Sequence, residues 1–484
     1  MKKSGIEETD PGDPRAQILA GARKSIQDAY GLPSLQKPSG GFGYWSGTQE
    51  DVALTAYILR LLSEASGFIE VDPDVTSKAR AYLIKQQAQT GAWTRYDWST
   101  ARQKDNPQET AYVVRALATS SGSLGAKERS IVDSAVKKAL SYLDDRIDEW
   151  KNPYLIGNYA IAAASINHAV HIAHARELLS RLAHREGAAT YWNLEANTTP
   201  FYGWGHTGRM ETTALAVEAL AMLQTPGHDP VEDAQVNRGL QYLLTHKDRY
   251  CTWFSTQATQ NVIEALIAAL PPANGGAAEG SATILVNGTK LASVQLPKPG
   301  EVTGPKVIEI GKGLAPGSNK IEIRRSGESS AIEATAITTY YLPWGQSQTT
   351  KGEDLKLGDT SSLRLKVDFD RRQANIGEAV VCRIEAERIG FRGYGMMMAE
   401  IGLPPGAEVD RESLEKARGT GVDGYEVQPD RVVFYLWPKA GGAAFDFSFR
   451  PRFAIDALSA PSTLYDYYNP EANATVLPVR FTVQ

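Results

Sequence analysis

Three acidic residues stand where a glycosidase could use them. Asp51, Glu109 and Glu211 each begin an apolar stretch that has the pattern of a helix. If those helix starts converge, paired carboxylates could act there as acid and base on a glycosidic bond. Carboxylates at helix N-termini also complement the helix dipole without any catalytic role, and we favour this second interpretation.

Three histidines are the other candidates for chemistry, as metal ligands. His168, His171 and His174 follow one another at intervals of three residues. A helix would turn the third well away from the first, whereas a metal site wants ligands on one face with oriented outer partners. We therefore expect a solvated loop and helix start here, and we assign no catalytic, cofactor-binding or metal residue to the chain.

The two cysteines, Cys251 and Cys382, lie far apart in dissimilar segments. This excludes a disulfide framework. Small buried thiols are the expected state of both.

A repeat positions these residues in the first half of the chain. A loop of glycine and aromatic residues precedes an apolar, Ala-rich helix, and the unit recurs about every 50 residues. The loops are 40–45, 91–93, 202–205 and 250–254, and the helices 51–62, 109–117, 211–223 and 256–270, with 152–164 a weaker copy.

More charged, amphipathic helices alternate with these apolar ones, as solvent-facing helices should. They are predicted at residues 15–30, 75–87, 128–147, 172–185 and 231–246. Outer and inner helices that alternate in this way form an α/α toroid, and five pairs can be identified.

Beyond about residue 271 short β-rich runs replace the helical periodicity. A first unit has strands predicted at 282–286, 307–310 and 321–323, with Asn287-Gly288 as a hairpin turn. The number of later runs suggests a sandwich: 363–369, 379–386, 396–401, 432–436, 445–449 and 479–483, with a short helix at 411–416. We divide the chain into a toroid (1–272), a β domain (273–345), a linker (346–357) and a sandwich (358–484).

Several of these elements resemble the C-terminal part of the α2-macroglobulin/complement family of thioester proteins. Ser255-Thr256-Gln257 is similar to the start of the family's last inner helix, and residues 395–405 and 464–471 resemble its receptor-binding domain. Residues 52–57 and 211–214 look like earlier inner helices. The resemblance implies that 273–345 is part of a CUB-like domain and that the source is a bacterial, cysteine-poor member.

The resemblance also implies what this chain lacks. The family's toroid has six helix pairs, and the first carries the Cys-Gly-Glu-Gln motif whose Cys and Gln form the thioester. Neither Cys251 nor Cys382 has a Gln three residues later, so the thioester is absent from this chain. No histidine stands at 96–103, where fast-reacting members have one. A closed toroid without one pair would expose apolar surface, so we expect the parent to continue upstream of Met1.

The implied function is that of a broad-range endopeptidase inhibitor that traps proteases, of which this chain is a non-catalytic C-terminal fragment. Two alternatives stay open: a toroidal enzyme acting on an isoprenoid or a glycan, and a thioester-less binding or structural module. The first lacks support in the sequence, because Asp144-Asp145 is an isolated pair rather than the Asp-rich element of the cyclases.

The C-terminal domain could also bind a receptor or another protein partner. Residues 465–468, Tyr-Asp-Tyr-Tyr, could form a binding surface, although we expect them to pack as core. Lys416 could engage a receptor, as lysines there do in some relatives, but a solvated charge is expected.

A net charge of -5 argues against nucleic acid as a partner. There is no apolar run long enough for a membrane span, and no signal peptide. The resemblance places the parent outside the cell or in the periplasm.

Overall fold

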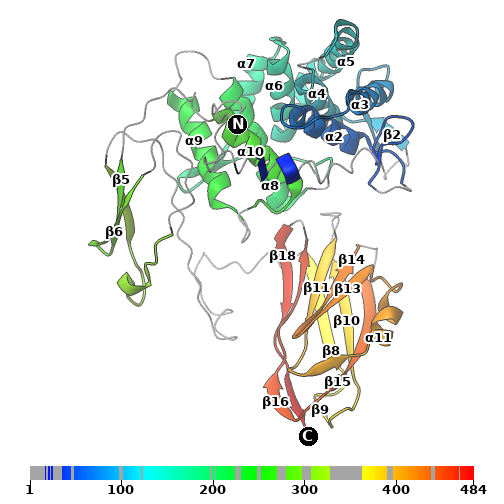
Figure 1. The fold of residues 1–484 in the computed structure, drawn as a ribbon, viewed down its shortest axis with the longest axis vertical. Coiled ribbons are helices and arrows are strands. Elements are labelled where there is room, and N and C mark those ends of the chain that lie inside the picture. Colours follow the sequence, from blue (N-terminus) through cyan, green and yellow to red (C-terminus); the bar gives the residue numbers. More distant parts are fainter. Residues whose placement is uncertain are drawn as a thin grey trace.

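The computed structural model describes most of the chain, as helices followed by β-sheets (Figure 1). The described residues are 17, 20, 21, 23–25, 35–44, 48–97, 102–121, 124–196, 199–201, 203–223, 230–247, 252–269, 280–296, 307–326, 362–389, 396–437, 442–467 and 469–484. The predicted linker 346–357, Cys251 and Tyr468 lie outside them.

Inner helices form the core of the first part, as predicted. They are α2 (Val52–Ala65), α4 (Pro107–Thr119), α6 (Pro153–Ser165), α8 (Gly205–Met222) and α10 (Thr256–Ala269). Helices α2, α4 and α6 start at an Asp or Asn cap whose side chain accepts a backbone N–H. Each inner helix packs against the next along the chain. The buried alanines let these helices approach closely on several faces.

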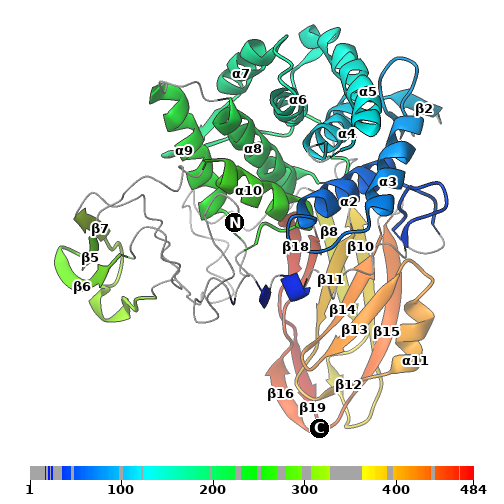
Figure 2. The same ribbon diagram turned by 45° about the horizontal axis from the view of Figure 1, so that its top comes forward.

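Outer helices cover this ring, seen end-on in Figure 2. They are α3 (Pro73–Lys85), α5 (Ala126–Asp144), α7 (Ile172–Arg181) and α9 (Pro230–Thr245). Helices α3, α5 and α7 each bury a single apolar stripe, as the amphipathic pattern predicts. The described residues of the first predicted outer helix, among them 20, 21 and 23–25, are helical. Two short hairpins lie in the connections, β1 (Thr94–Asp97) with β2 (Arg102–Asp105) and β3 (His184–Glu186) with β4 (Ala189–Tyr191).

Tryptophans bind several loops of the repeat to the outer helix that precedes them. The indole N–H of Trp93 donates to Leu83 O at 2.8 Å, and that of Trp253 to Leu243 O at 2.6 Å. Glycine is needed in the first two loops, because Gly40 and Gly91 have positive φ and a Cβ there would lie within 2.4 Å of a carbonyl oxygen of the neighbouring outer helix.

The third copy of this loop differs from the sequence-based expectation. Trp192, not Trp204, makes the equivalent bond, to Leu179 O at 2.7 Å. The backbone N–H of Trp192 also donates to Thr213 Oγ1, as that of Trp93 does to Thr110 Oγ1. Trp192 therefore occupies the repeat position in this loop, and Trp204, just before α8, makes a different contact.

A three-stranded antiparallel sheet follows the toroid, in the order β6-β5-β7. Its strands are β5 (Ser281–Val286), β6 (Thr289–Gln295) and β7 (Ile321–Ser326), with the predicted Asn287-Gly288 turn between the first two. The prediction of a strand at 307–310 is wrong. Both edges of β5 are already occupied by β6 and β7, and Val307 is 88% exposed.

The last part is a β-sandwich, as predicted. A four-stranded sheet, β12-β15-β10-β8, faces a five-stranded sheet, β13-β14-β11-β17-β18, and a small sheet, β16-β19-β9, closes one end. The core between them contains Phe434, Phe445, Phe447 and Phe449. The bounds are β8 (Leu363–Phe369), β9 (Gln373–Ala374), β10 (Val380–Arg388), β11 (Met397–Gly402), β12 (Ala407–Val409), α11 (Arg411–Ala417), β13 (Gly424–Gln428), β14 (Arg431–Leu436), β15 (Ala443–Pro451), β16 (Ile455–Leu458), β17 (Ser462–Asp466), β18 (Asn469–Val476) and β19 (Arg480–Val483).

Candidate functional site: the toroid and its contact with the sandwich

Two of the three predicted carboxylates lie near each other at the N-terminal ends of the inner helices, which we call the toroid mouth. Asp51 caps α2 and accepts the N–H of Leu54 at 2.7 Å, the structural role favoured from the sequence. Glu109 lies in the first turn of α4 and its Oε2 is 3.9 Å from Arg95 Nη1. Burial raises the pKa of Glu109 to about 7, although Arg95 opposes the shift.

Glu211 is the most deeply buried of the three. It is 1% exposed, and burial raises its pKa to about 8, with a hydrogen bond from Thr199 as the opposing influence. Its Oε2 atom has no hydrogen-bond partner among the described residues, and a Cβ at Gly203 would lie 2.5 Å from its Oε1. Glu211 is therefore a protonated acid at neutral pH, enclosed by its own loop.

A buried charge network joins the inner helices, and no pattern considered in the sequence predicts it. Arg115 of α4 is buried and donates to Glu218 of α8 at 2.7 Å and to Glu264 of α10 at 2.6 Å. The same guanidinium reaches Asn158 of α6. Arg60 of α2 lies 3.2 Å from Glu264. One arginine thus ties four inner helices together, and Arg60 links the first to the last.

The pKa values of the two glutamates in this network shift in opposite directions. Burial raises the pKa of Glu218 despite the nearby Arg115. For Glu264 burial acts in the same direction, but Arg60 and Arg115 outweigh it and lower the pKa. The signal in the sequence was an arginine and a glutamate inside apolar, Ala-rich helices. Such residues are rarely buried without partners, so each is a signal that another charge lies on a neighbouring helix.

Two of the three histidines lie beside acidic side chains, and the third stands at a helix start. His168 pairs with Asp144 at 3.0 Å, His171 is the N-cap residue of α7, and His174 lies 3.9 Å from Glu177. Within the described ranges no group of three or more potential ligands could hold a metal ion. Asp144 also accepts the hydroxyl of Tyr159 at 2.6 Å.

Trp204 leaves the toroid and enters the core of the sandwich. Its indole N–H donates to Asp466 Oδ2 at 3.3 Å, and Arg388 donates to the same oxygen at 2.5 Å. Asp466 is fully buried, and the Arg388 guanidinium lies 5.6 Å from the Trp204 ring centroid. A tryptophan from one domain therefore completes a buried ion pair of the other.

The residues after Trp204 extend this contact. The backbone N–H of His206 donates to Asn469 Oδ1 at 3.1 Å. Gly205 has a φ of +54°, and a Cβ there would lie 2.4 Å from the Asn469 amide nitrogen. The His206 ring is buried against Phe254 and His246. Burial, with smaller effects of His246 and Arg209, lowers the pKa of His206 to about 4. Figure 1 shows the strand β18 approaching α8 at this point.

The other predicted candidates divide between core and surface. Lys416 is exposed on α11 and pairs with Glu412 at 3.0 Å. Cys382 is buried on β10, and burial raises its thiol pKa well above the usual range. The expectation that residues 465–468 pack as core is wrong for Tyr467, which is 44% exposed. The alternation of β17 turns Asp466 inward and its neighbours outward.

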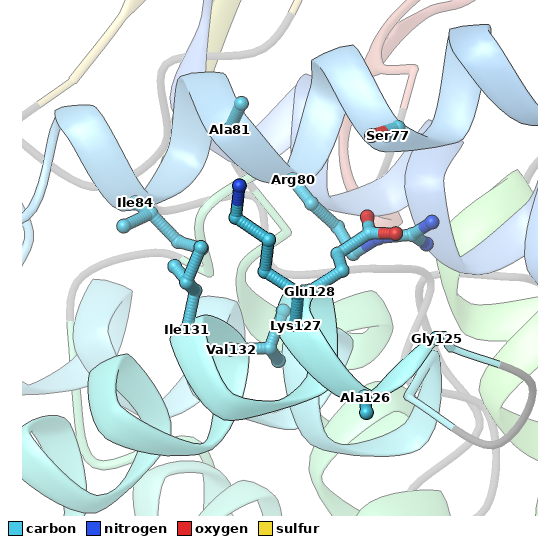
Figure 3. A pocket seen from close by; sticks show the side chains of 10 residues that line it. All are labelled: Ser77, Arg80, Ala81, Ile84, Gly125, Ala126, Lys127, Glu128, Ile131 and Val132. Carbon is cyan, nitrogen blue, oxygen red and sulfur yellow. The ribbon is translucent and has the colours of Figure 1, made fainter.

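A shallow cleft of about 490 Å³ lies between the outer helices α3 and α5 (Figure 3). Ile84 and Ile131 line one end, and Arg80 with Glu128 the other. Arg80 Nε donates to Glu128 Oε1 at 2.7 Å. The charge of Arg80 is thus neutralised by Glu128. The residues that line the cleft do not form a pair of nucleophile and base.

Comparison with known proteins defines the class. The model of the A-macroglobulin TED domain matches residues 18–268, and that of the A-macroglobulin receptor binding domain matches residues 393–477. The first covers the toroid and the second the middle of the sandwich. The chain belongs to the α2-macroglobulin/complement family of thioester proteins.

Individual relatives are distant. Thioester-containing protein 1 allele S1 of Anopheles gambiae is 22% identical over 462 residues, which cover 91% of this chain and 30% of that protein. The chain spans about a third of the length of the curated relatives it matches. Native α2-macroglobulin of Escherichia coli, from domain MG7 to the C-terminus, matches 100% of this chain and 70% of that one, with a TM-score of 0.56 and 13% identity. Salmonella α2-macroglobulin reacted with methylamine gives 0.54 and 14%, over 100% of this chain and 28% of that one.

Over the described residues, no helix is both long and apolar enough to cross a bilayer.

Proposed function

We propose that this chain is the C-terminal portion of an α2-macroglobulin-like inhibitor that traps endopeptidases, and that it catalyses no reaction itself. The observation that carries this proposal is the contact of Trp204 with Asp466, which joins a toroid and a receptor-binding-type sandwich of one family. Proteases are the proposed partners through the longer protein, and the proposed compartment is extracellular or periplasmic. We keep the division at residues 272, 345 and 357 as part of this proposal.

The thioester of such an inhibitor lies outside this chain. Cys382 is buried in the sandwich, on the strand β10. Arg383-Ile384-Glu385 follow it, and Thr252-Trp253-Phe254 follow Cys251. A thiol that is buried and protonated is a poor nucleophile and a poor acyl acceptor. Two groups that could serve an enzyme instead, Asp51 and Glu109, are an N-cap and an arginine-paired acid.

Radiolabelled methylamine tests this assignment. The chain alone should incorporate no methylamine and should leave the activity of added endopeptidases unchanged. The longer protein should incorporate the label, and replacement of its thioester cysteine by alanine should abolish incorporation. Incorporation by this chain alone, or turnover of a prenyl or glycan substrate by it, would contradict the proposal.

A further inference from the structure

The outer face of the five-stranded sheet carries aromatic side chains on neighbouring strands. Tyr435, Met398 and Tyr465 lie directly opposite one another on β14, β11 and β17. Because alternate residues of a strand share a face, these three side chains form one row across the sheet.

A second row lies one step nearer the toroid. Tyr467 donates its backbone N–H to Met396 O at 2.9 Å. Trp437 follows Leu436, which is the partner of Met397, so the antiparallel register places Trp437 opposite Met396. We call the two rows together the aromatic platform. Trp437 is 50% exposed and Tyr467 44% exposed, and Figures 1 and 2 show the toroid at one end of the sandwich rather than across its sheets.

Both tyrosines of the first row reach the neighbouring strand with their hydroxyls. The hydroxyl of Tyr465 donates to Glu400 Oε1 at 3.1 Å and contacts Met398 Sδ at 3.5 Å, both on β11. The hydroxyl of Tyr435 donates to Glu426 Oε1 at 2.7 Å on β13.

The Tyr435 ring lies beside Gly424 of β13. A Cβ at Gly424 would be 3.4 Å from Cδ2 of the ring, in ordinary van der Waals contact. Both tyrosine hydroxyls are held by carboxylates, so the rings are fixed before any ligand arrives, which reduces the entropy lost on binding.

The two rings are separated by a distance that the sheet sets. Tyr435 leans from β14 toward β13, and Tyr465 leans from β17 toward β11, in the same direction across the sheet. Their separation is therefore two strand spacings, about 9.6 Å. Trp437 and Tyr467 also start from strands that are two positions apart.

We propose that the aromatic platform binds an extended β-1,4-linked glycan chain. The C–H groups on the flat face of a pyranose pack against the electron-rich face of an aromatic ring. Two strand spacings match the repeat of two sugars in an extended β-1,4 chain, so alternate sugars would stack on successive rings. Glu400 and Glu426 have acceptor capacity left for the sugar hydroxyls. This site is additional to the proposed trapping of proteases and does not depend on it.

Isothermal titration calorimetry of the full chain tests the proposal, with three hexasaccharides as probes. Cellohexaose and N-acetylchitohexaose are β-1,4-linked, and a response to either supports the site and identifies the sugar. Maltohexaose has the α-1,4 linkage and winds into a helix, so it should give no binding. Absence of binding to both β-linked probes, or equal binding of maltohexaose, would overturn the proposal.

Two variants locate the binding on the platform. Trp437→Ala and Tyr435→Leu should each weaken the affinity about tenfold, because each removes one stacking face. Phe453→Ala is the matched control, since Phe453 is also an exposed aromatic residue of the sandwich, 52% exposed, but packs beside Gly406 away from the platform. Unchanged affinity in Trp437→Ala and Tyr435→Leu, with unaltered thermal unfolding, would refute the assignment.

Discussion

Burial in the toroid favours the uncharged form of the Glu211 carboxyl group. The pKa of Glu211 is raised to about 8, with burial as the main cause. The unfolded chain releases this proton at a lower pH, so between about 4.5 and 8 the folded state binds more protons than the unfolded one. The contribution of Glu211 to stability therefore decreases as pH rises through that window.

Replacing Glu211 by Gln should stabilise the protein at alkaline pH. Glutamine has nearly the same shape and never bears the charge, so the free energy of unfolding should rise by on the order of 4–5 kcal/mol at pH 8.5 and by less than about 1 kcal/mol at pH 5. Urea unfolding at both pH values measures the difference. The exposed Glu195→Gln is the control and should change neither value. A gain for Glu211→Gln that is independent of pH would refute the assigned ionisation.

Arg115 should be among the residues whose loss costs the toroid most. Arg115→Met keeps the apolar stem but leaves Glu218 and Glu264 buried without their shared guanidinium. We expect a loss of about 3–5 kcal/mol in the free energy of unfolding. Arg364→Met, which breaks the exposed pair with Glu387, should cost less than about 1 kcal/mol. Similar losses in the two variants would contradict the central position of Arg115.

At the scale of elements, the sequence predicts the helices better than the loops. The alternation of apolar and amphipathic helices is encoded locally, in the spacing of alanine, leucine and charge, and the described helices follow it. The third loop was misassigned because Trp192 and Trp204 both stand in aromatic surroundings. Only the tertiary contacts distinguish the tryptophan that binds Leu179 from the one that binds Asp466.

The candidate site was less predictable for the same reason. Asp51 as a cap follows from its position before an apolar helix. The partners of Arg115 come from helices more than 40 residues away, and periodicity carries no information about which helices meet. In the sandwich, the alternation of β17 was not recognised, so Tyr467 was expected in the core.

The loop tryptophans Trp93 and Trp253 should contribute similar amounts to stability. Trp93→Phe removes the bond to Leu83 O and leaves unfilled volume between an outer and an inner helix. We expect a loss of about 2 kcal/mol in stability, and a similar loss for Trp253→Phe. Thermal unfolding followed by circular dichroism measures both, with the exposed Trp437→Phe as control. A loss in one but not the other would show that the repeat is not uniform in energy.

At the scale of the whole molecule, a contact around Trp204 joins the toroid and the sandwich among the residues that the structure describes. Trp204, Gly205 and His206 meet Asp466 at the end of β17 and Asn469 at the start of β18. Intramolecular domain contacts of small area permit relative motion unless they are strongly apolar. The buried indole is therefore the main constraint on the orientation of the two parts.

Trp204→Ala should release this constraint. Small-angle X-ray scattering should show an increased radius of gyration, because Asp466 and Arg388 lose the ring that covers them. Trp437→Ala removes an exposed tryptophan of the same sandwich and should leave the scattering unchanged. An unaltered curve for Trp204→Ala would mean that other contacts determine the arrangement.

The position of Trp204 also affects how the protein can be dissected. The interior of the sandwich includes a side chain supplied by the toroid, so the sandwich is not self-contained. Produced by itself, it would present an open apolar socket beside a charged pair, and such a surface invites self-association. A stable isolated sandwich would need a substitute for that indole, such as a short peptide carrying Trp204-Gly205-His206.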